Sequence, residues 1–286
     1  MDLYARVNIL EGKAVRLPRG NVKDEVIFLE ANPLERAHGW VSKGANRLLV
    51  VDLDAAAHGD YRNRPLINEI IADVDVPVQV GGGVRTPAEV DALLSGGAWR
   101  VTMGTTAMVD QVLFWDICRD HPGRIAASLD VLPNQELAIR GWTEGSGSYL
   151  EETLIELSSA GAAAFMLSEV GRDALNEPPN FDNLRLALTT VEEEVIAAGG
   201  VRGLEDLESL RDLEVDGRQV GGVVVGREVT AGRFTFEEAV VLVRREFGPP
   251  KGPWSAEELQ QALATFQASL PGRADAEAFL AWLNGS

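Results

Sequence analysis

The sequence predicts an α/β protein that folds as a (β/α)₈ barrel made of two similar halves, with a helical extension at the C-terminus. Two observations support this prediction. Eight short apolar segments alternate with helix-like segments along most of the 286 residues, and the two halves of this region carry the same motifs in the same order. An open, doubly wound sheet is the alternative, because periodicity does not show whether a sheet closes.

The eight predicted strands are mostly continuous apolar runs, as is typical of strands buried on both faces. They span residues 4–9, 47–53, 76–80, 100–103, 125–129, 164–167, 195–197 and 222–225. Apolar residues at helical spacing predict helices over 65–72, 88–94, 149–159 and 235–247. Pro87 suits the first turn of the second of these helices.

The chain repeats itself. The motif GGVR at 82–85 recurs at 199–202, and similar residues follow both copies, TPAEVDAL in the first and GLEDLESL in the second. Three more pairs match in the same order: 5–8 with 127–130, 51–53 with 168–170, and 101–104 with 223–226. A single match would be chance, but four in order indicate two half-barrels related by a pseudo-twofold axis.

Composition narrows the class of partner. With 26 Lys and Arg against 44 Asp and Glu, the formal net charge is −18, and 45% of the residues are hydrophobic. This excess of carboxylates argues against nucleic-acid binding. It does not prevent binding of a small phosphorylated ligand, because backbone N–H groups can bind phosphate locally.

The sequence indicates no metal, cofactor or membrane segment. Cys118 is the single cysteine, so neither an intramolecular disulfide nor a cysteine zinc cluster can form. The histidines, His38, His58 and His121, lack metal-ligand spacing. No apolar run approaches the roughly 20 residues of a membrane span, and the N-terminus does not resemble a signal peptide. We therefore expect a cytoplasmic protein that uses no cofactor.

The composition changes near the C-terminus. We expect residues 1–247 to form the barrel, the segment 248–253 (GPPKGP) to be a linker, and 254–286 to form a helical hairpin that begins at the capping box of Ser255 and Glu258. The hairpin either packs as an extra layer on the barrel or offers residues 254–283 for self-association or for a partner. We favour the extra layer.

Glycine-rich strand ends in each half predict two anion-binding sites. Glycine lets the backbone approach a ligand closely, and a helix N-terminus presents N–H groups to an anion. Loops that follow neighbouring barrel strands converge at one face, so the two sites can hold a ligand with a phosphate at each end. The predicted phosphate-binding residues are Gly82, Gly83, Gly104 and Thr105 in the first half and Gly199, Gly200, Gly226 and Arg227 in the second.

Polar residues also stand at matching strand ends. Asn8 corresponds to Asp130, and Asp52 corresponds to Glu169. Four polar residues at corresponding places favour an active-site ring. We expect Asp52 to contact substrate. A single carboxylate at such a place is often a helix cap or an ion-pair partner, and this alternative applies to Asp52.

Two further residues are candidates for substrate contacts. Arg16 follows the first predicted strand and can reach an anionic substrate, although surface arginines are usually only solvated. Trp142, in the segment RGW, fits a lid over the site and a place in the core equally well.

These motifs resemble the phosphoribosyl isomerase family of histidine biosynthesis, including its bifunctional actinobacterial branch, which also acts in tryptophan biosynthesis. The resemblance covers about residues 3–246. The sister cyclase family shares the fold and the half-repeat, but GTTAM and RGW resemble the isomerase more closely. The segments that carry the resemblance are 7–17, 50–56, 76–94, 100–108, 128–130, 140–142, 197–210 and 221–235.

The resemblance implies a (β/α)₈ barrel with two phosphate sites and a reaction without metal or organic cofactor. The family's isomerases perform an Amadori rearrangement of a ProFAR-like aminoaldose phosphate into an aminoketose. One acid helps to open the ribose ring and one base removes the proton on C2. Asp130 matches a family aspartate, and Arg16 matches an arginine that contacts substrate in the bifunctional branch.

The departures from the family pattern fall on the catalytic residues. Asn8 replaces a catalytic aspartate, and loss of a general base typically lowers a rate by about 10²–10⁴. Ser168 and Glu169 replace a Thr-Asp pair; we expect Ser168 to contact substrate and Glu169 to act with Asp130 as the remaining acid/base pair. Ala198 replaces a serine in the second phosphate site.

Three hypotheses follow from these matches and departures. The first is an isomerase homologue with altered or reduced activity. The second is a non-catalytic barrel that binds a phosphosugar or another protein. The third is a different enzyme that acts on another phosphorylated metabolite.

Overall fold

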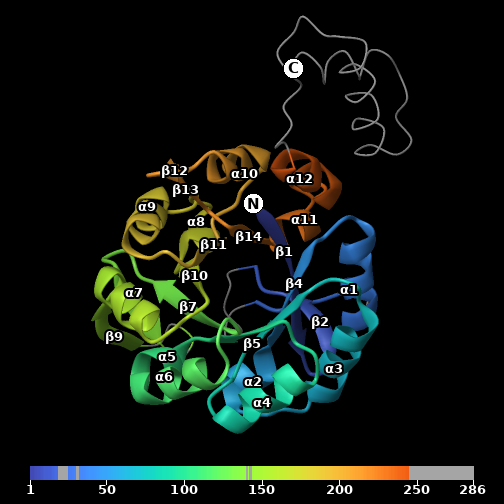
Figure 1. Cartoon of the computed structure of the whole chain (residues 1–286). Coiled ribbons are helices and arrows are strands. Elements are labelled where there is room, and N and C mark those ends of the chain that lie inside the picture. Colours follow the sequence, from blue (N-terminus) through green and yellow to red (C-terminus); the bar gives the residue numbers. More distant parts are fainter. Residues whose placement is uncertain (19–24, 30–31, 140, 142–143, 245–286) are drawn as a thin grey trace, which may run out of the picture.

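Eight parallel strands form a closed barrel surrounded by helices (Figure 1). The computed structural model describes residues 1–18, 25–29, 32–139, 141 and 144–244. The barrel strands, in order around the barrel, are β1 (Asp2–Leu10), β4 (Arg47–Asp52), β5 (Val78–Gly81), β6 (Arg100–Met103), β7 (Ile125–Val131), β10 (Ala164–Glu169), β11 (Glu194–Ala198) and β14 (Gly222–Val225). β14 pairs with β1 from Asp2↔Gly222 to Ala5↔Val225, which closes the barrel. The predicted (β/α)₈ barrel is confirmed, and the open sheet is excluded.

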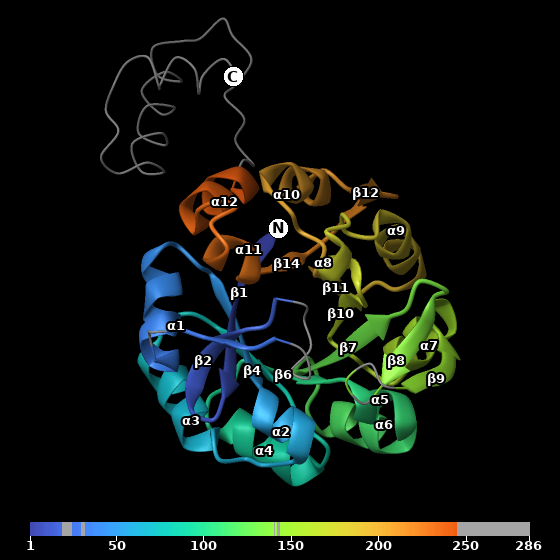
Figure 2. The ribbon, with the colours of Figure 1, turned by 180° about the vertical axis from the view of Figure 1, so that it is seen from behind.

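Helices form the outer layer, seen from both ends of the barrel in Figures 1 and 2. The four predicted helices correspond to α3, α4, α7 and α12, and residues 245–247 of the last prediction lie outside the described residues. The helices are α1 (Pro33–Ser42), α2 (Leu53–His58), α3 (Arg64–Asp73), α4 (Pro87–Ser95), α5 (Thr105–Val109), α6 (Gln111–Asp120), α7 (Leu150–Ser159), α8 (Arg172–Leu175), α9 (Phe181–Thr190), α10 (Leu204–Arg211), α11 (Arg227–Thr230) and α12 (Phe236–Val243).

Local chemistry explains where several helices begin. Thr86 caps α4 by accepting a hydrogen bond from the backbone N–H of Glu89, and the Glu89 carboxylate accepts from the backbone N–H of Thr86. Pro87 occupies the first turn of this helix, where its missing N–H is not needed. The same reciprocal cap starts α12 at Thr235 and Glu238. Capping of this kind typically contributes about 0.5–2 kcal/mol per helix.

Side chains alternate between the two faces of each barrel strand, and this alternation decides which residues face the interior of the barrel. In β1, Leu3, Ala5 and Val7 pack in the main core with residues of the surrounding helices. Tyr4 belongs to a second buried cluster that lies inside the barrel. Side chains two and four residues further along β1 therefore also face the interior.

Charged and aromatic residues close the N-terminal end of the barrel. Glu194 accepts hydrogen bonds from the Tyr4 hydroxyl at 2.9 Å and from Arg100 Nη1 at 2.7 Å. The guanidinium groups of Arg47 and Arg100 lie 4.8 and 4.1 Å from the centre of the Trp99 ring. Burial is the main cause that raises the pKa of Tyr4, and the neighbouring Glu194 adds to it. The interior is therefore filled at this end and opens at the other.

Additional strands extend β1 and β7 in the same way, and the sequence reasoning did not predict them. β2 (Lys13–Arg16) pairs antiparallel with β1, and β3 (Ile27–Phe28) with β2. β8 (Glu136–Ile139) and β9 (Glu144–Tyr149) extend β7 similarly. Positive φ angles at Glu11 and Gly12 form the two-residue turn between β1 and β2. A short separate pair consists of β12 (Glu214–Val215) and β13 (Arg218–Gln219).

The expected C-terminal extension is not part of this description. The linker 248–253 and the hairpin 254–286 lie outside the described residues, so their roles stay predictions. Within residues 1–244, as far as they are described, no helix is both long and apolar enough to cross a membrane.

Candidate active site

The C-terminal ends of the barrel strands surround a cavity of about 960 Å³. Both sets of predicted phosphate-binding turns open onto this cavity, from opposite halves of the chain. The predicted residues in its wall are Asn8, Arg16, Gly82, Gly83, Gly104, Thr105, Asp130, Ser168, Gly199, Gly226 and Arg227. Gly200, Asp52 and Glu169 are not in the wall, and Trp142 lies outside the described residues.

The cavity wall is cationic although the chain carries a formal net charge of −18. Among the described lining residues, the carboxylates are Asp130 and Glu228, whereas five residues are arginines. Such local excess of positive charge attracts an anionic ligand into the cavity against the overall field of the molecule. The five arginines are Arg6, Arg16, Arg36, Arg85 and Arg227.

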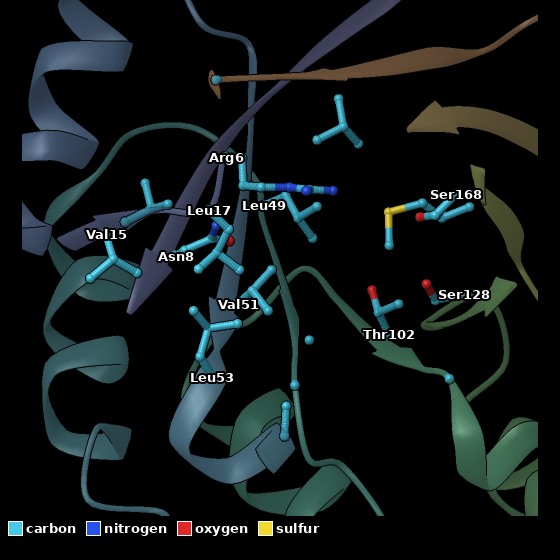
Figure 3. Close-up of a pocket in the computed structure, with 18 of the residues that line it drawn as sticks. Arg6, Asn8, Val15, Leu17, Leu49, Val51, Leu53, Thr102, Ser128 and Ser168 are labelled. Carbon is cyan, nitrogen blue, oxygen red and sulfur yellow. The ribbon is translucent and has the colours of Figure 1, made fainter. Parts of the chain in front are cut away.

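Arg6 and the hydroxyl groups opposite it shape the inner part of the cavity. Figure 3 shows the Arg6 side chain extending from β1 toward the wall that carries Thr102, Ser128 and Ser168. Thr102 is 5% exposed, and its Oγ1 has no hydrogen-bond partner among the described residues. Sequence reasoning missed Arg6, although its position two residues before Asn8 on an alternating strand was the available signal.

Arg36 was also missed because it comes from helix α1. Its guanidinium lies 4.0 Å from the centre of the Trp40 ring and donates a hydrogen bond to Thr230 Oγ1. Burial lowers the pKa of Arg36 below its ordinary value. Nothing in the sequence around Arg36 indicates that α1 brings it to the cavity.

Arg16 reaches the cavity from strand β2, which folds back along β1. Its Nε atom is buried and has no hydrogen-bond partner within the described part of the chain. Asn8, which pairs with Val15 in this hairpin, also lies in the cavity wall. The β1–β2 turn thus brings a cation close to the position where the family carries an aspartate.

The first glycine turn is required by packing as well as by ligand access. Gly82 and Gly83 have φ angles of 96° and 70°. A Cβ atom at Gly82 would lie 2.2 Å from the carbonyl oxygen of Asp52, and one at Gly83 would lie 2.3 Å from that of Ala55. The turn therefore packs directly on the junction between β4 and α2, and no larger residue fits.

Asp52 holds this junction together and does not face the cavity. It is fully buried and accepts hydrogen bonds from the Ala55 N–H at 3.1 Å and from Asn63 Nδ2 at 2.9 Å. Asn63 also donates to Asp54, whose carboxylate accepts from the Glu11 N–H at 2.7 Å. Burial raises the pKa of Asp52, and these hydrogen bonds oppose the rise. Asp52 is therefore the cap of helix α2 in this structure, and the expected substrate contact stays a prediction.

Glu169 has an equivalent place in the second half. Its side chain is 8% exposed and accepts hydrogen bonds from Asn183 Nδ2 at 2.8 Å and Asn180 Nδ2 at 3.3 Å. Burial raises the pKa of Glu169, whereas these amides and Arg172 lower it. Because neighbouring residues on a strand face opposite sides, Ser168 lines the cavity and Glu169 faces helix α9. Glu169 therefore lies outside the wall that carries Asp130, and its expected acid/base role stays a prediction.

The arginine of each GGVR motif organises the helix that follows it. The Arg85 N–H donates to Glu89 at 2.6 Å, and the Arg202 N–H donates to Asp206 at 2.7 Å. The Arg202 guanidinium also pairs with Asp206. Burial raises the pKa of Asp206, but the hydrogen bonds from Arg202 outweigh it and hold the pKa below its usual value. The repeat therefore includes a stabilising contact in each half.

The two turns differ in two charged residues, because Thr105 and Thr106 of the first turn correspond to Arg227 and Glu228 of the second. Gly104 precedes α5 and Gly226 precedes α11, at equivalent places in the repeat. In the second turn, Glu228 Oε2 accepts from the Gly226 N–H at 3.2 Å, and Oε1 accepts from Arg227 at 2.7 Å. No group of three or more His, Cys, Asp or Glu residues that could hold a metal ion occurs in the described ranges.

The closed barrel and the paired turns define a (β/α)₈ protein with an arginine-lined cavity at the C-terminal face. A family model described as "Histidine biosynthesis protein" matches residues 2–235. The chain belongs to this histidine biosynthesis family, which confirms the resemblance inferred from the motifs.

Relatives of known name match nearly the whole barrel. One from Geobacter sulfurreducens is 35% identical over 86% of this chain and 99% of its own length. One from Gloeothece citriformis is 39% identical over 85% of this chain and 93% of its own length. Both are named 1-(5-phosphoribosyl)-5-((5-phosphoribosylamino)methylideneamino) imidazole-4-carboxamide isomerase, a name that contains two phosphoribosyl groups.

Proposed function

We propose that this protein is an aldose–ketose isomerase of the histidine-biosynthesis type that acts on a phosphorylated, N-substituted aminoaldose. One observation carries the proposal: the glycine turns of the two halves, five arginines and Asp130 surround one cavity. The turns and arginines supply N–H donors and positive charge for a phosphate. Asp130 supplies a group that can give and take a proton.

Asp130 can serve both steps of an Amadori rearrangement. As a carboxylic acid it donates a proton to the ribose ring oxygen, so that the C1–O bond breaks and a C1–N double bond forms. The resulting carboxylate then removes the proton from C2, which gives an enolic intermediate. Asp130 returns this proton to C1 and takes the proton of the C2 hydroxyl as the ketone forms, so it ends the cycle as a carboxylic acid. Substrate and product are isomers, so the reaction needs no oxidant or reductant.

Asn8 limits the rate of this reaction. Its amide can orient a hydroxyl group by hydrogen bonding but cannot accept a proton as a carboxylate does. One carboxylate must therefore change roles within a turnover, and we propose that activity is reduced relative to a barrel with a carboxylate at position 8. The cost of a missing general base is typically about 10²–10⁴ in rate.

A non-catalytic phosphosugar-binding protein is the second candidate. Asn8 stands where the family pattern has an aspartate, and the Glu169 carboxylate is engaged by Asn180 and Asn183 outside the cavity. A ligand could then be held at the arginines and the first turn without conversion. The two candidates differ in what Asp130 does after binding.

The test compares wild type with Asp130→Asn, using the relatives' substrate and its two singly dephosphorylated forms. We expect slow conversion by wild type and a loss of about 10²–10⁴ in kcat for Asp130→Asn, with affinity little changed, because only proton transfer is removed. Asp182→Asn, an exposed carboxylate on α9, is the matched control. Binding without conversion by either protein would favour the non-catalytic candidate, and absence of binding would refute both.

A further inference from the structure

We infer that Glu228 determines specificity: it excludes a phosphate from the second turn, so that the substrate of this protein carries one phosphate, held at the first turn. The inference rests on the proposed function, since it takes the cavity to be a phosphosugar site. It narrows the substrate class from a compound with two terminal phosphates to one with a single phosphate and an uncharged second end.

The Glu228 carboxylate already occupies the anion position of the second turn. The residue is 4% exposed and lies in the cavity wall. Oε2 accepts from the Gly226 N–H, the donor that a phosphate oxygen would use, and Oε1 pairs with Arg227 at 2.7 Å. The Gly226 N–H and the Nη2 atom of Arg227 are therefore both engaged by the chain's own carboxylate.

Other polar groups of the second turn are also paired internally. The Thr230 hydroxyl donates to the Gly226 carbonyl oxygen at 2.7 Å, and Arg36 donates to the Thr230 hydroxyl. Five residues thus form a continuous set of hydrogen bonds: Arg36, Thr230, Gly226, Glu228 and Arg227. A ligand phosphate would have to break these bonds and would face an anion at contact distance, and like charges at such a distance repel strongly where water is excluded.

The first half of the molecule provides the internal comparison. Because Gly104 corresponds to Gly226, Thr106 occupies the place of Glu228. The Thr106 hydroxyl donates to the carbonyl oxygen of Val84 at 3.3 Å and carries no charge. No carboxylate of the described residues takes the corresponding position at the first turn. The second turn carries Arg227 and Glu228 where the first carries Thr105 and Thr106, and Glu228 is the anion that distinguishes the second turn from the first as a phosphate site.

The experiment measures affinity by calorimetry for the relatives' substrate, which has two phosphates, and for its two singly dephosphorylated forms. Wild type is compared with Glu228→Thr, which places at position 228 the residue found at position 106 of the first turn, and with Glu228→Gln, which keeps a hydrogen-bond acceptor for the Gly226 N–H but removes the charge. Circular dichroism checks that each variant is folded.

We expect wild type to bind one of the singly dephosphorylated forms at least as tightly as the doubly phosphorylated compound. Glu228→Thr and Glu228→Gln should bind the doubly phosphorylated compound at least about tenfold more tightly than wild type does, with little change for the preferred singly phosphorylated form. If wild type instead prefers the doubly phosphorylated compound and neither variant gains affinity, the inference is overturned while the proposed function stands. If no compound binds to wild type or to either variant, the result contradicts the proposed function, and with it the inference that rests on it.

Discussion

Position 8 shows how an amide in place of a carboxylate changes the proton-transfer chemistry available in the cavity. Asn8 and Asp130 lie in the same cavity wall, at equivalent strand ends of the two halves. A carboxylate at both places would provide separate acid and base groups, whereas an amide and a carboxylate provide one. The sequence alone was sufficient to identify this difference, because strand-end positions can be matched through the repeat.

A carboxylate introduced at position 8 should therefore increase the rate of the proposed isomerisation. We predict that Asn8→Asp raises kcat by about 10²–10⁴ on the substrate that wild type binds best, because a second proton-transfer group becomes available. Steady-state kinetics on purified protein measures the change. Asn8→Ala is the control and should not raise kcat, so an equal gain in both variants, or no gain in Asn8→Asp, would contradict the role given to this position.

At the scale of elements, strand alternation decides which carboxylates can do chemistry. Asp52 and Glu169 end strands β4 and β10, yet both side chains face helices, because they are the outward members of an alternating series. Sequence reasoning placed both residues at the correct strand ends. It could not place their side chains, since the strands are apolar on both faces and do not show a period of two.

The contact between Arg202 and Asp206 should stabilise helix α10 in a pH-dependent way. The pKa of Asp206 in the folded protein is below its usual value, so its stabilising effect is present above the unfolded-state pKa and is lost as the pH falls through the folded-state pKa. We predict that Asp206→Asn lowers the free energy of unfolding by about 1–3 kcal/mol at neutral pH.

Urea denaturation at about pH 7 and at about pH 3 measures this effect, since the usual pKa of an aspartate lies between these values. The difference between wild type and Asp206→Asn should shrink at the lower pH. Glu205→Gln on the same helix, at an exposed position, should show little difference at either pH. A difference for Asp206→Asn that stays constant with pH would point to lost packing instead.

At the scale of the whole molecule, the two ends of the barrel do different work. The N-terminal end is filled by a network in which Glu194 of the second half bonds to Tyr4 and Arg100 of the first. The C-terminal end is open and holds the cavity. Binding groups can vary at the open end without loss of the fold, because closure is secured at the other end.

Removing the central carboxylate of this network should destabilise the barrel without changing ligand binding. We predict that Glu194→Ala lowers the free energy of unfolding by about 2–5 kcal/mol, because Arg100 would keep its charge in a largely buried place without its partner. Thermal and urea denaturation measure the loss. Glu192→Ala, an exposed carboxylate just before β11, is the control, and equal effects of the two variants would contradict the network's role.

The sequence by itself predicted a (β/α)₈ barrel of two similar halves, the approximate positions of its eight barrel strands and of four helices, the paired glycine turns and the difference between Asn8 and Asp130 at matching strand ends. These follow from patterns that neighbouring residues carry along the chain: apolar runs, capping pairs and repeated motifs. Only the tertiary structure decided that the barrel closes, that Asp52 and Glu169 face helices, that Arg36 reaches the cavity, and that the Glu228 carboxylate contacts the second turn. These depend on side-chain direction and on contacts between distant segments, and local sequence patterns do not contain that information.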